Sequence, residues 1–176
     1  ASKALNGTGQ LRDATRLRVK EAAEKLGFVG DARARALSSG RTYTVGMITT
    51  DSFGRFSIPV LLGAEDALSA GRMAVLLCDT RDDHVREAHY LRSLAARGVD
   101  GIIVTGRSAD ARPPIDASIP VVYAFSPSTD DSDVSVTLDD AAGSALVASH
   151  VHSLGRQRVA IVTGPARHRS AARRVA

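Results

Sequence analysis

The chain has 176 residues, enough for one α/β domain and a small appendage. With 44% hydrophobic and 24% charged residues, it can bury a core and does not have the composition of a disordered protein. Aromatic residues make up 4% of the chain and Trp is absent, which argues against a stacking surface for single-stranded nucleic acid.

Composition also bears on compartment and membrane contact. No stretch approaches the roughly 20 apolar residues that a membrane span needs, and no signal-peptide pattern opens the chain. The single cysteine, Cys78, lies in an apolar run and has no second cysteine with which to form an internal disulfide. The sequence therefore predicts a protein of the reducing cytoplasm with no membrane partner.

The net charge of +4 is distributed unevenly along the chain. Residues 1–43 hold 9 Lys/Arg against 4 Asp/Glu, a net of +5, whereas residues 44–163 hold 10 against 15, a net of −5. A basic head on an acidic body is typical of a polyanion-binding appendage attached to a separate domain. From charge alone, an ordinary solvated basic helix explains the head equally well.

The basic head is predicted to be helical. Hydrophobic periodicity and turn residues indicate three helices, at residues 1–5, 13–26 and 31–38. In the second helix Asp13 is the expected N-cap, and Gly27 is the expected C-terminal stop. Ser39-Gly40 then reads as a linker.

From Thr44 onwards strands alternate with helices. Apolar runs predict five strands, at residues 44–50, 73–78, 101–105, 120–125 and 159–163. Helices are predicted at residues 58–70, 83–97 and 139–154, and residues 126–133 form a surface loop. In the second of these helices Leu91, Leu94 and Ala95 are expected to face inward. This alternation predicts an α/β, Rossmann-like parallel sheet covered on both faces.

The ends of the five predicted strands indicate where a ligand would bind. In open α/β sheets, ligands bind outside the carboxyl ends of the strands. Here those ends are Thr50-Asp51, Asp79-Thr80, Thr105-Gly106, Phe125-Ser126 and Thr163-Gly164. We expect them to converge on one crevice that holds a small molecule.

Motifs for an enzyme of this fold class are missing from the sequence. There is no phosphate-binding G-x-x-x-x-G-K-[ST] loop, and the pair Gly7-x-Gly9 lacks the third glycine and follows no strand. The five histidines show no metal-ligand spacing, and no G-x-S-x-G elbow is present. The sequence therefore predicts a protein that is not an enzyme and needs no cofactor or metal.

Several short motifs follow one another in a characteristic order. The head contains S-K-A-L-N-G at Ser2–Gly7, Thr15-Arg16 followed by L-G-F, and Ala34-x-x-Leu37. The body contains D-G-I-I, I-P-V-V, L-G, G-P and a final S-x-x-x-R, at residues 100–103, 119–122, 154–155, 164–165 and 170–174. Each motif is weak alone, but their combined order and spacing are specific.

In this order the chain resembles the lac-repressor/galactose-repressor (LacI) family of bacterial transcriptional regulators. The resemblance implies a partial helix-turn-helix head at residues 1–30, a hinge helix and linker at 31–43, and the N-terminal part of a periplasmic-binding-protein-like effector domain at 44–176. It also implies that the family's first helices and its second core subdomain lie outside residues 1–176.

Four positions depart from the family pattern. Gly30-Asp31 replaces Pro-Asn before the hinge helix, which removes a residue that preorganises a helix start, although Asp31 can still cap. Lys3 replaces an Arg suited to bidentate guanine contacts. Phe125 stands where a carboxylate is common, and Arg156 replaces a His.

The resemblance implies a dimer whose recognition helices enter the major grooves of an operator in double-stranded DNA. Ser2, Lys3 and Asn6 would lie near bases and phosphates, and Thr15 and Arg16 would contact the backbone. In the hinge, Arg33, Ala34 and Arg35 would lie close to the DNA, and Leu37 would wedge into the minor groove. Two other interpretations remain open. In one of them the residues of the head belong to an ordinary solvated helix end, and in the other Leu37 packs on residues 44–176.

The resemblance also implies a small-molecule effector, a sugar or a sugar derivative. Phe56 corresponds to a position that stacks on a sugar ring, and Phe125 would also border the ligand. Asp51 and Asp79 would accept hydrogen bonds from hydroxyl groups, and Arg174 would donate to two of them. Loop packing for Phe56 and capping or turn formation for the aspartates remain open.

The dimer interface would involve the helix at residues 58–70, again by resemblance. The protein is thus predicted to be a repressor that forms a homodimer or a higher homo-oligomer. It is expected to act on the nucleoid in the bacterial cytoplasm, under the control of its effector. The alternative is a periplasmic-type sugar-binding protein, or another Rossmann-like ligand-binding domain, that does not bind DNA.

Overall fold

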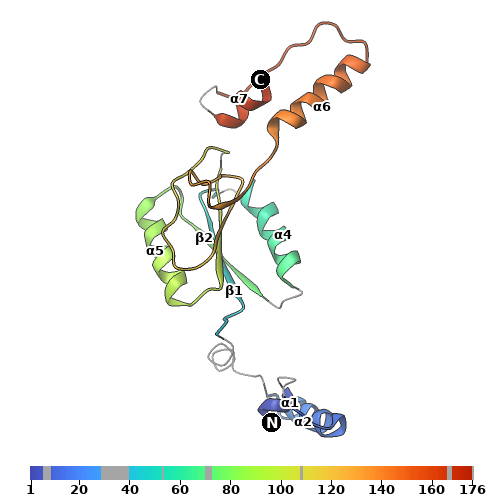
Figure 1. Ribbon diagram of the computed structural model, residues 1–176, viewed down its shortest axis with the longest axis vertical. Coiled ribbons are helices and arrows are strands. Elements are labelled where there is room, and N and C mark those ends of the chain that lie inside the picture. The colour runs from blue at the N-terminus through green and yellow to red at the C-terminus, as the bar shows by residue number, and fades with distance from the viewer. Residues whose placement is uncertain are drawn as a thin grey trace. The chain divides into compact units, whose positions relative to one another are not determined.

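The computed structural model describes residues 1–5, 9–28, 40–52, 54–69, 73–107, 109–165 and 168–175. The chain divides into two compact units, Ala1–Gly40 and Arg41–Ala176 (Figure 1). Each unit is described by itself. The predicted hinge helix at residues 31–38 lies outside the described residues.

The described residues of the first unit form two helices, α1 (Ser2–Leu5) and α2 (Asp13–Lys25). Gly27 has a φ of 60°, a left-handed conformation that ends α2 as the sequence predicts. The predicted N-cap is wrong by one residue, because Arg12 occupies that position without a side-chain cap and Asp13 begins the helix. Asp13 still places a negative charge in the first helical turn, where the helix dipole favours it.

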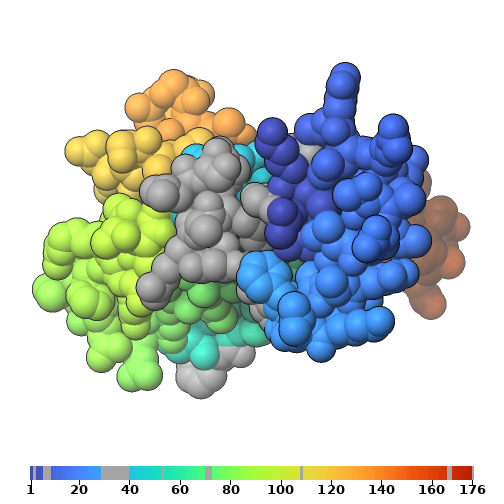
Figure 2. Space-filling view, turned by 90° about the horizontal axis from the view of Figure 1, so that it is seen from below, coloured from blue at the N-terminus to red at the C-terminus, as the bar shows by residue number. Residues whose placement is uncertain are grey.

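The apolar side chains of the first unit are mostly open to solvent. Ala4 is buried, but Leu17, Leu26 and Phe28 are exposed, with Leu26 83% accessible. Figure 2 shows part of this unit's surface in blue. The amphipathic segment therefore forms the helix α2, but no described residue of the unit buries the apolar face of this helix.

The second unit is built on one five-stranded sheet. Its strands are β1 (Thr44–Thr49), β2 (Ala74–Asp79), β3 (Gly101–Thr105), β4 (Val121–Ala124) and β5 (Val134–Val136). Their order is β2-β1-β3-β4-β5, and every neighbouring pair is parallel. The structure confirms the predicted α/β fold with a parallel sheet.

Helices lie on both sides of this sheet. Figure 1 shows α4 (Ser57–Ser69) and α5 (His84–Ala96) on opposite faces. Towards the C-terminus, α6 (Asp140–Ser153) and the short α7 (Arg169–Val175) contact each other. Among the described residues, no helix is long and apolar enough to cross a membrane.

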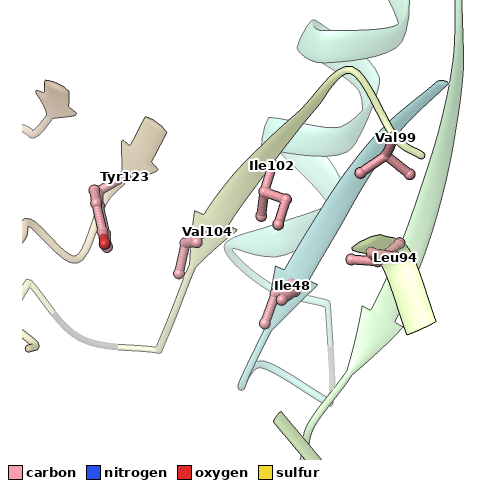
Figure 3. Close-up of a cluster of buried hydrophobic side chains, with 6 residues drawn as sticks. All are labelled: Ile48, Leu94, Val99, Ile102, Val104 and Tyr123. Atoms are coloured by element: carbon pink, nitrogen blue, oxygen red, sulfur yellow. The ribbon is translucent and has the colours of Figure 1, made fainter. Parts of the chain in front are cut away.

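The core fills the space between the sheet and α5 (Figure 3). It is a cluster of buried side chains from β1, α5, the turn before β3, β3 itself and β4, namely Ile48, Leu94, Val99, Ile102, Val104 and Tyr123. Leu94 packs directly on β1 at Gly46, where an added Cβ would lie 2.5 Å from Leu94 Cδ1. Leu91 packs against the same cluster, but Ala95 is exposed, so its predicted inward orientation is wrong.

Two strand predictions are also wrong. Residues 159–163 form neither strand nor helix, and Val162 is 99% exposed. An apolar run becomes a strand only where another strand can pair with it, and no described strand lies beside this segment. The edge position next to β4 belongs instead to β5, within a stretch where the sequence predicted no strand.

Candidate functional site

The carboxyl ends of the strands surround one polar cavity with a volume of about 220 Å³. Hydroxyl and acidic side chains predominate in its lining, which consists of Thr50, Thr80, Asp82, Asp83, His84, Glu87, Thr105, Gly106, Asp110, Ala111, Arg112, Pro113 and Ser126. Four of the five predicted strand ends contribute to it, and only Thr163-Gly164 does not. The crevice expected at the carboxyl ends of the predicted strands is therefore present.

The hydroxyl groups of the cavity are packed closely around Gly106. A Cβ added at Gly106 would lie 2.6 Å from Ser126 Oγ and 3.3 Å from Thr50 Oγ1, so only glycine leaves this space open. Thr105 is 1% exposed, and its Oγ1 has no hydrogen-bond partner among the described residues. A buried hydroxyl without a partner is costly, and such groups occur where a ligand or water completes the site.

Several charged residues of the cavity already have partners within the protein. Arg112 Nη2 donates to Glu87 Oε1 at 2.6 Å, and both side chains are mostly buried. Asp82 pairs with Arg107 at 3.0 Å. Asp83 caps α5 by accepting from the backbone N–H groups of the helix's first turn. These carboxylates therefore have protein partners before any ligand arrives.

Asp51 is held by the start of α4. It is 4% exposed, and its Oδ2 accepts the backbone N–H groups of Phe56 at 2.6 Å and Ser57 at 3.1 Å. Burial alone would raise the pKa of Asp51, but the hydrogen bonds from Phe56 and Ser57, with the charge of Arg107, bring it below its usual value. Asp51 is therefore an ionised acceptor for the backbone, as the capping interpretation anticipated.

The two predicted aromatic residues lie against each other. The rings of Phe56 and Phe125 stack with centroids 4.6 Å apart and planes 17° apart, and the Arg55 guanidinium lies 5.4 Å from the Phe56 ring. Phe125 has a φ of 77°, an unfavourable conformation for a residue with a Cβ. The stack joins the loop after β1 to the end of β4, while other residues form the cavity lining.

Asp79 and Arg174, the remaining predicted effector residues, lie in different surroundings. Asp79 closes the turn after β2, where its Oδ1 accepts from Arg81 N at 2.9 Å and from Ser52 Oγ at 3.3 Å. Arg174 Nε donates to Asp140 Oδ1 at 2.7 Å. The Asp140 side chain is only 5% exposed, so this pair fixes α7 to the beginning of α6.

Sequence analysis did not assign Asp140, Glu87, Asp110 or Arg112 to the site. Asp110 accepts the backbone N–H of Arg169 at 2.9 Å, which brings the start of α7 to a residue of the cavity. The only signal for Asp140 was its place at a helix start. Glu87 and Arg112 are 25 positions apart, so no local pattern could pair them.

The predicted DNA-contacting residues lie mostly in the first unit. Lys3 and Thr15 are exposed, on α1 and α2. Arg16 is half-buried, and its Nη2 is 3.5 Å from the Gly9 carbonyl oxygen. Ser2 begins α1. The other five, Asn6, Arg33, Ala34, Arg35 and Leu37, lie outside the described residues.

A parallel sheet with a polar cavity at its carboxyl edge has the architecture of a ligand-binding α/β domain. Residues 42–176 match the family described as periplasmic binding proteins and the sugar-binding domain of the LacI family. The chain belongs to this family.

Curated relatives with similar sequences are transcriptional regulators. The chain is 32% identical over 179 aligned residues to the maltose regulon regulatory protein MalI of Escherichia coli K12, an alignment that covers 99% of this chain and 52% of MalI. It is 38% identical over 103 residues to the transcriptional repressor PurR of Aliivibrio fischeri strain MJ11, covering 58% of this chain and 31% of PurR. The chain therefore spans about half the length of MalI, and its alignment with PurR covers 31% of that protein.

The fold is also found in a solved repressor structure. The lac repressor dimer bound to operator and the anti-inducer ONPF matches 99% of this chain and 54% of its own, with a TM-score of 0.71 and 19% identity. At that identity the match establishes the fold alone.

Proposed function

We propose that this protein is a DNA-binding transcriptional regulator, a repressor, whose operator affinity is controlled by a small-molecule effector. The observation that carries the proposal is the union of a LacI-type body with a separate basic helical unit in one chain. The similarity to MalI covers 99% of the chain and therefore includes that unit. The relatives are regulators, which supports a role other than catalysis.

The first unit and the linker are the proposed DNA interface. Residues 1–30 would form part of a helix-turn-helix head, and residues 31–43 the hinge. Lys3 on α1 and Thr15 on α2 are exposed and available to phosphates. Arg16 follows Thr15 on α2. Ser2 and Asn6 would complete the head's contacts, and Arg33, Ala34 and Leu37 those of the hinge.

The cavity in residues 44–176 is the proposed effector site. Its clustered hydroxyl groups and its unpartnered Thr105 suit a polar ligand such as a sugar or a sugar derivative. Asp51, Asp79 and the stack of Phe56 on Phe125 lie at the carboxyl ends of the surrounding strands and would form its border. Arg174 would reach the ligand only by exchanging or sharing its bond to Asp140.

We propose further that the protein is a homodimer, that α4 contributes to its interface, and that it acts in the bacterial cytoplasm on the nucleoid. Ile58 and Leu62 on α4 are exposed, which leaves apolar surface for such an interface. Sedimentation of the protein at several concentrations would test the dimer.

Operator binding is the decisive experiment. Duplexes selected from a random library on the full-length protein should converge on a pseudo-palindrome, and their affinity should fall steeply with salt. Six to ten phosphate contacts would lower affinity about 10³- to 10⁵-fold between about 50 and 200 mM salt. A control with Lys3→Ala should bind all duplexes more weakly and show a shallower salt slope.

The opposite result would identify the alternative function. If selection yields no sequence preference and no salt-dependent affinity, the protein is a ligand-binding domain without a DNA-binding role.

A further inference from the structure

The chain enters the second unit through residues 41–43, which Asp100 holds in place; we call these residues together with Asp100 the joint. The two carboxylate oxygens of Asp100 accept consecutive backbone N–H groups, Oδ1 from Thr42 at 2.9 Å and Oδ2 from Tyr43 at 2.8 Å. A carboxylate that accepts two backbone N–H groups forms strong, charge-assisted hydrogen bonds. Asp100 therefore fixes the backbone immediately before β1.

Other contacts hold residues 41–43 from both sides. Thr42 Oγ1 donates to the Gly98 carbonyl oxygen at 2.8 Å, and Ala74 N donates to the Tyr43 carbonyl oxygen at 2.9 Å. The guanidinium of Arg41 lies 5.7 Å from the Tyr43 ring, and its Nε is 3.9 Å from Asp100 Oδ2. The segment is thus attached both to β2 and to the turn before β3.

Tyr43 adopts a conformation that needs this support. Its φ of 54° lies in the left-handed region, which is unfavourable for a residue with an aromatic side chain. Such a conformation persists only where the surroundings impose it. The hydrogen bond from Tyr43 N to Asp100 is one of the contacts that impose it.

The joint and the cavity lie at opposite ends of the same two strands. Residues 41–43 lead into β1 and Asp100 leads into β3, and these strands are direct neighbours. At their carboxyl ends, Thr50 and Thr105 line the cavity. A shift of β1 against β3 at the cavity would therefore reach Asp100 through at most six residues of hydrogen-bonded strand.

We propose that Asp100 is a positioning residue that fixes where the chain leaves the sheet towards the first unit and that couples this exit to the cavity through β1 and β3. The proposal concerns the regulation of the proposed effector site and rests on that function for its biological meaning. The joint itself can be tested without an effector or an operator.

Amide hydrogen exchange measured by NMR on the whole chain tests the joint. In Asp100→Ala, the Thr42 and Tyr43 amides should exchange about tenfold to a hundredfold faster, because each loses a charge-assisted bond. Asp100→Asn retains an acceptor oxygen and should have a smaller effect. The control is Asp131→Asn, which changes an exposed carboxylate in the loop between β4 and β5 and should leave both amides unchanged.

The exchange pattern separates positioning from general stability. If Asp100 positions the segment, the amides of β1 and β3 keep their protection while those of Thr42 and Tyr43 lose theirs. If Thr42 and Tyr43 stay protected in Asp100→Ala, or if all strand amides accelerate by the same factor, the proposal is overturned.

A change at the cavity tests the coupling. Gly106→Ala pushes a Cβ towards Ser126 and should alter exchange at Thr42 and Tyr43 in the original chain but not in Asp100→Ala. Thr105→Val supplies a second perturbation if Gly106→Ala does not fold. If neither folded variant affects the two amides, the coupling is refuted. Failure to bind operator would instead refute the proposed function and leave these measurements intact.

Discussion

Thr105→Val should stabilise the domain while it weakens ligand binding. Valine has nearly the shape of threonine, so the substitution removes the hydroxyl without opening a cavity. The Thr105 side chain is 1% exposed and its Oγ1 has no partner among the described residues. An unsatisfied buried polar group costs about 1–3 kcal/mol, and Thr105→Val should recover a gain of that order in unfolding free energy. A gain of about 1 kcal/mol corresponds to roughly 2–8 °C in melting temperature.

Thr80→Val provides the matched control. Thr80 lines the same cavity and is also 1% exposed, but its Oγ1 donates to the Thr49 carbonyl oxygen at 3.1 Å. This variant loses a hydrogen bond and should be destabilised by about 0.5–1.5 kcal/mol. Urea unfolding of the two variants against the original chain should therefore give changes of opposite sign. Equal destabilisation by both would show that the Thr105 hydroxyl is satisfied, and the argument for a ligand at that position would fail.

Three further substitutions test the surroundings of the site, the core and α4. Folding lowers the pKa of Asp51, so ionised Asp51 stabilises the folded state fully at a pH above the unfolded-state pKa near 3.8. This contribution is lost as the pH falls through the folded-state pKa. Unfolding free energies measured from pH 6 to 2 should therefore show a loss in acid that Asp51→Asn lacks. Gly46→Ala should destabilise by about 1–3 kcal/mol, because its Cβ would overlap Leu94, whereas Gly63→Ala in α4 meets open space and should stabilise by about 0.5–1 kcal/mol. A destabilised Gly63→Ala or a neutral Gly46→Ala in thermal unfolding would contradict this packing.

The sheet was largely predictable because its central strands are continuous apolar runs. Helices and neighbouring strands cover β1 and β3, so most of their residues are buried and apolar, which makes both strands recognisable in the sequence. β5 is only three residues long, and all three are exposed, so it carries no such signal. Residues 159–163 show the converse, since apolar composition indicates a preference to be buried but does not supply the strand that would cover it.

The candidate site was predictable in position but not in its contacts. Because ligands bind outside the carboxyl ends of parallel strands, the predicted strand ends indicated that Thr50, Thr80, Thr105 and Ser126 would meet at one edge. The bond between Arg174 and Asp140 depends on the path of the chain through α6 and α7, which local patterns do not specify. The stack of Phe56 on Phe125 likewise joins residues 69 positions apart in sequence, although each had been singled out separately.

The distribution of partners in the cavity bears on what its ligand must be. Asp83 accepts backbone N–H groups, Asp82 is paired with Arg107, and Glu87 is paired with Arg112. A charged ligand that paired with Arg112 or Glu87 would break a mostly buried ion pair and leave the displaced group poorly solvated, which is costly. A neutral hydroxyl-bearing ligand can instead bond to Thr105 and its neighbouring hydroxyls without disturbing any ion pair. We therefore expect the proposed effector to be uncharged and polar, because these carboxylates already have partners within the protein.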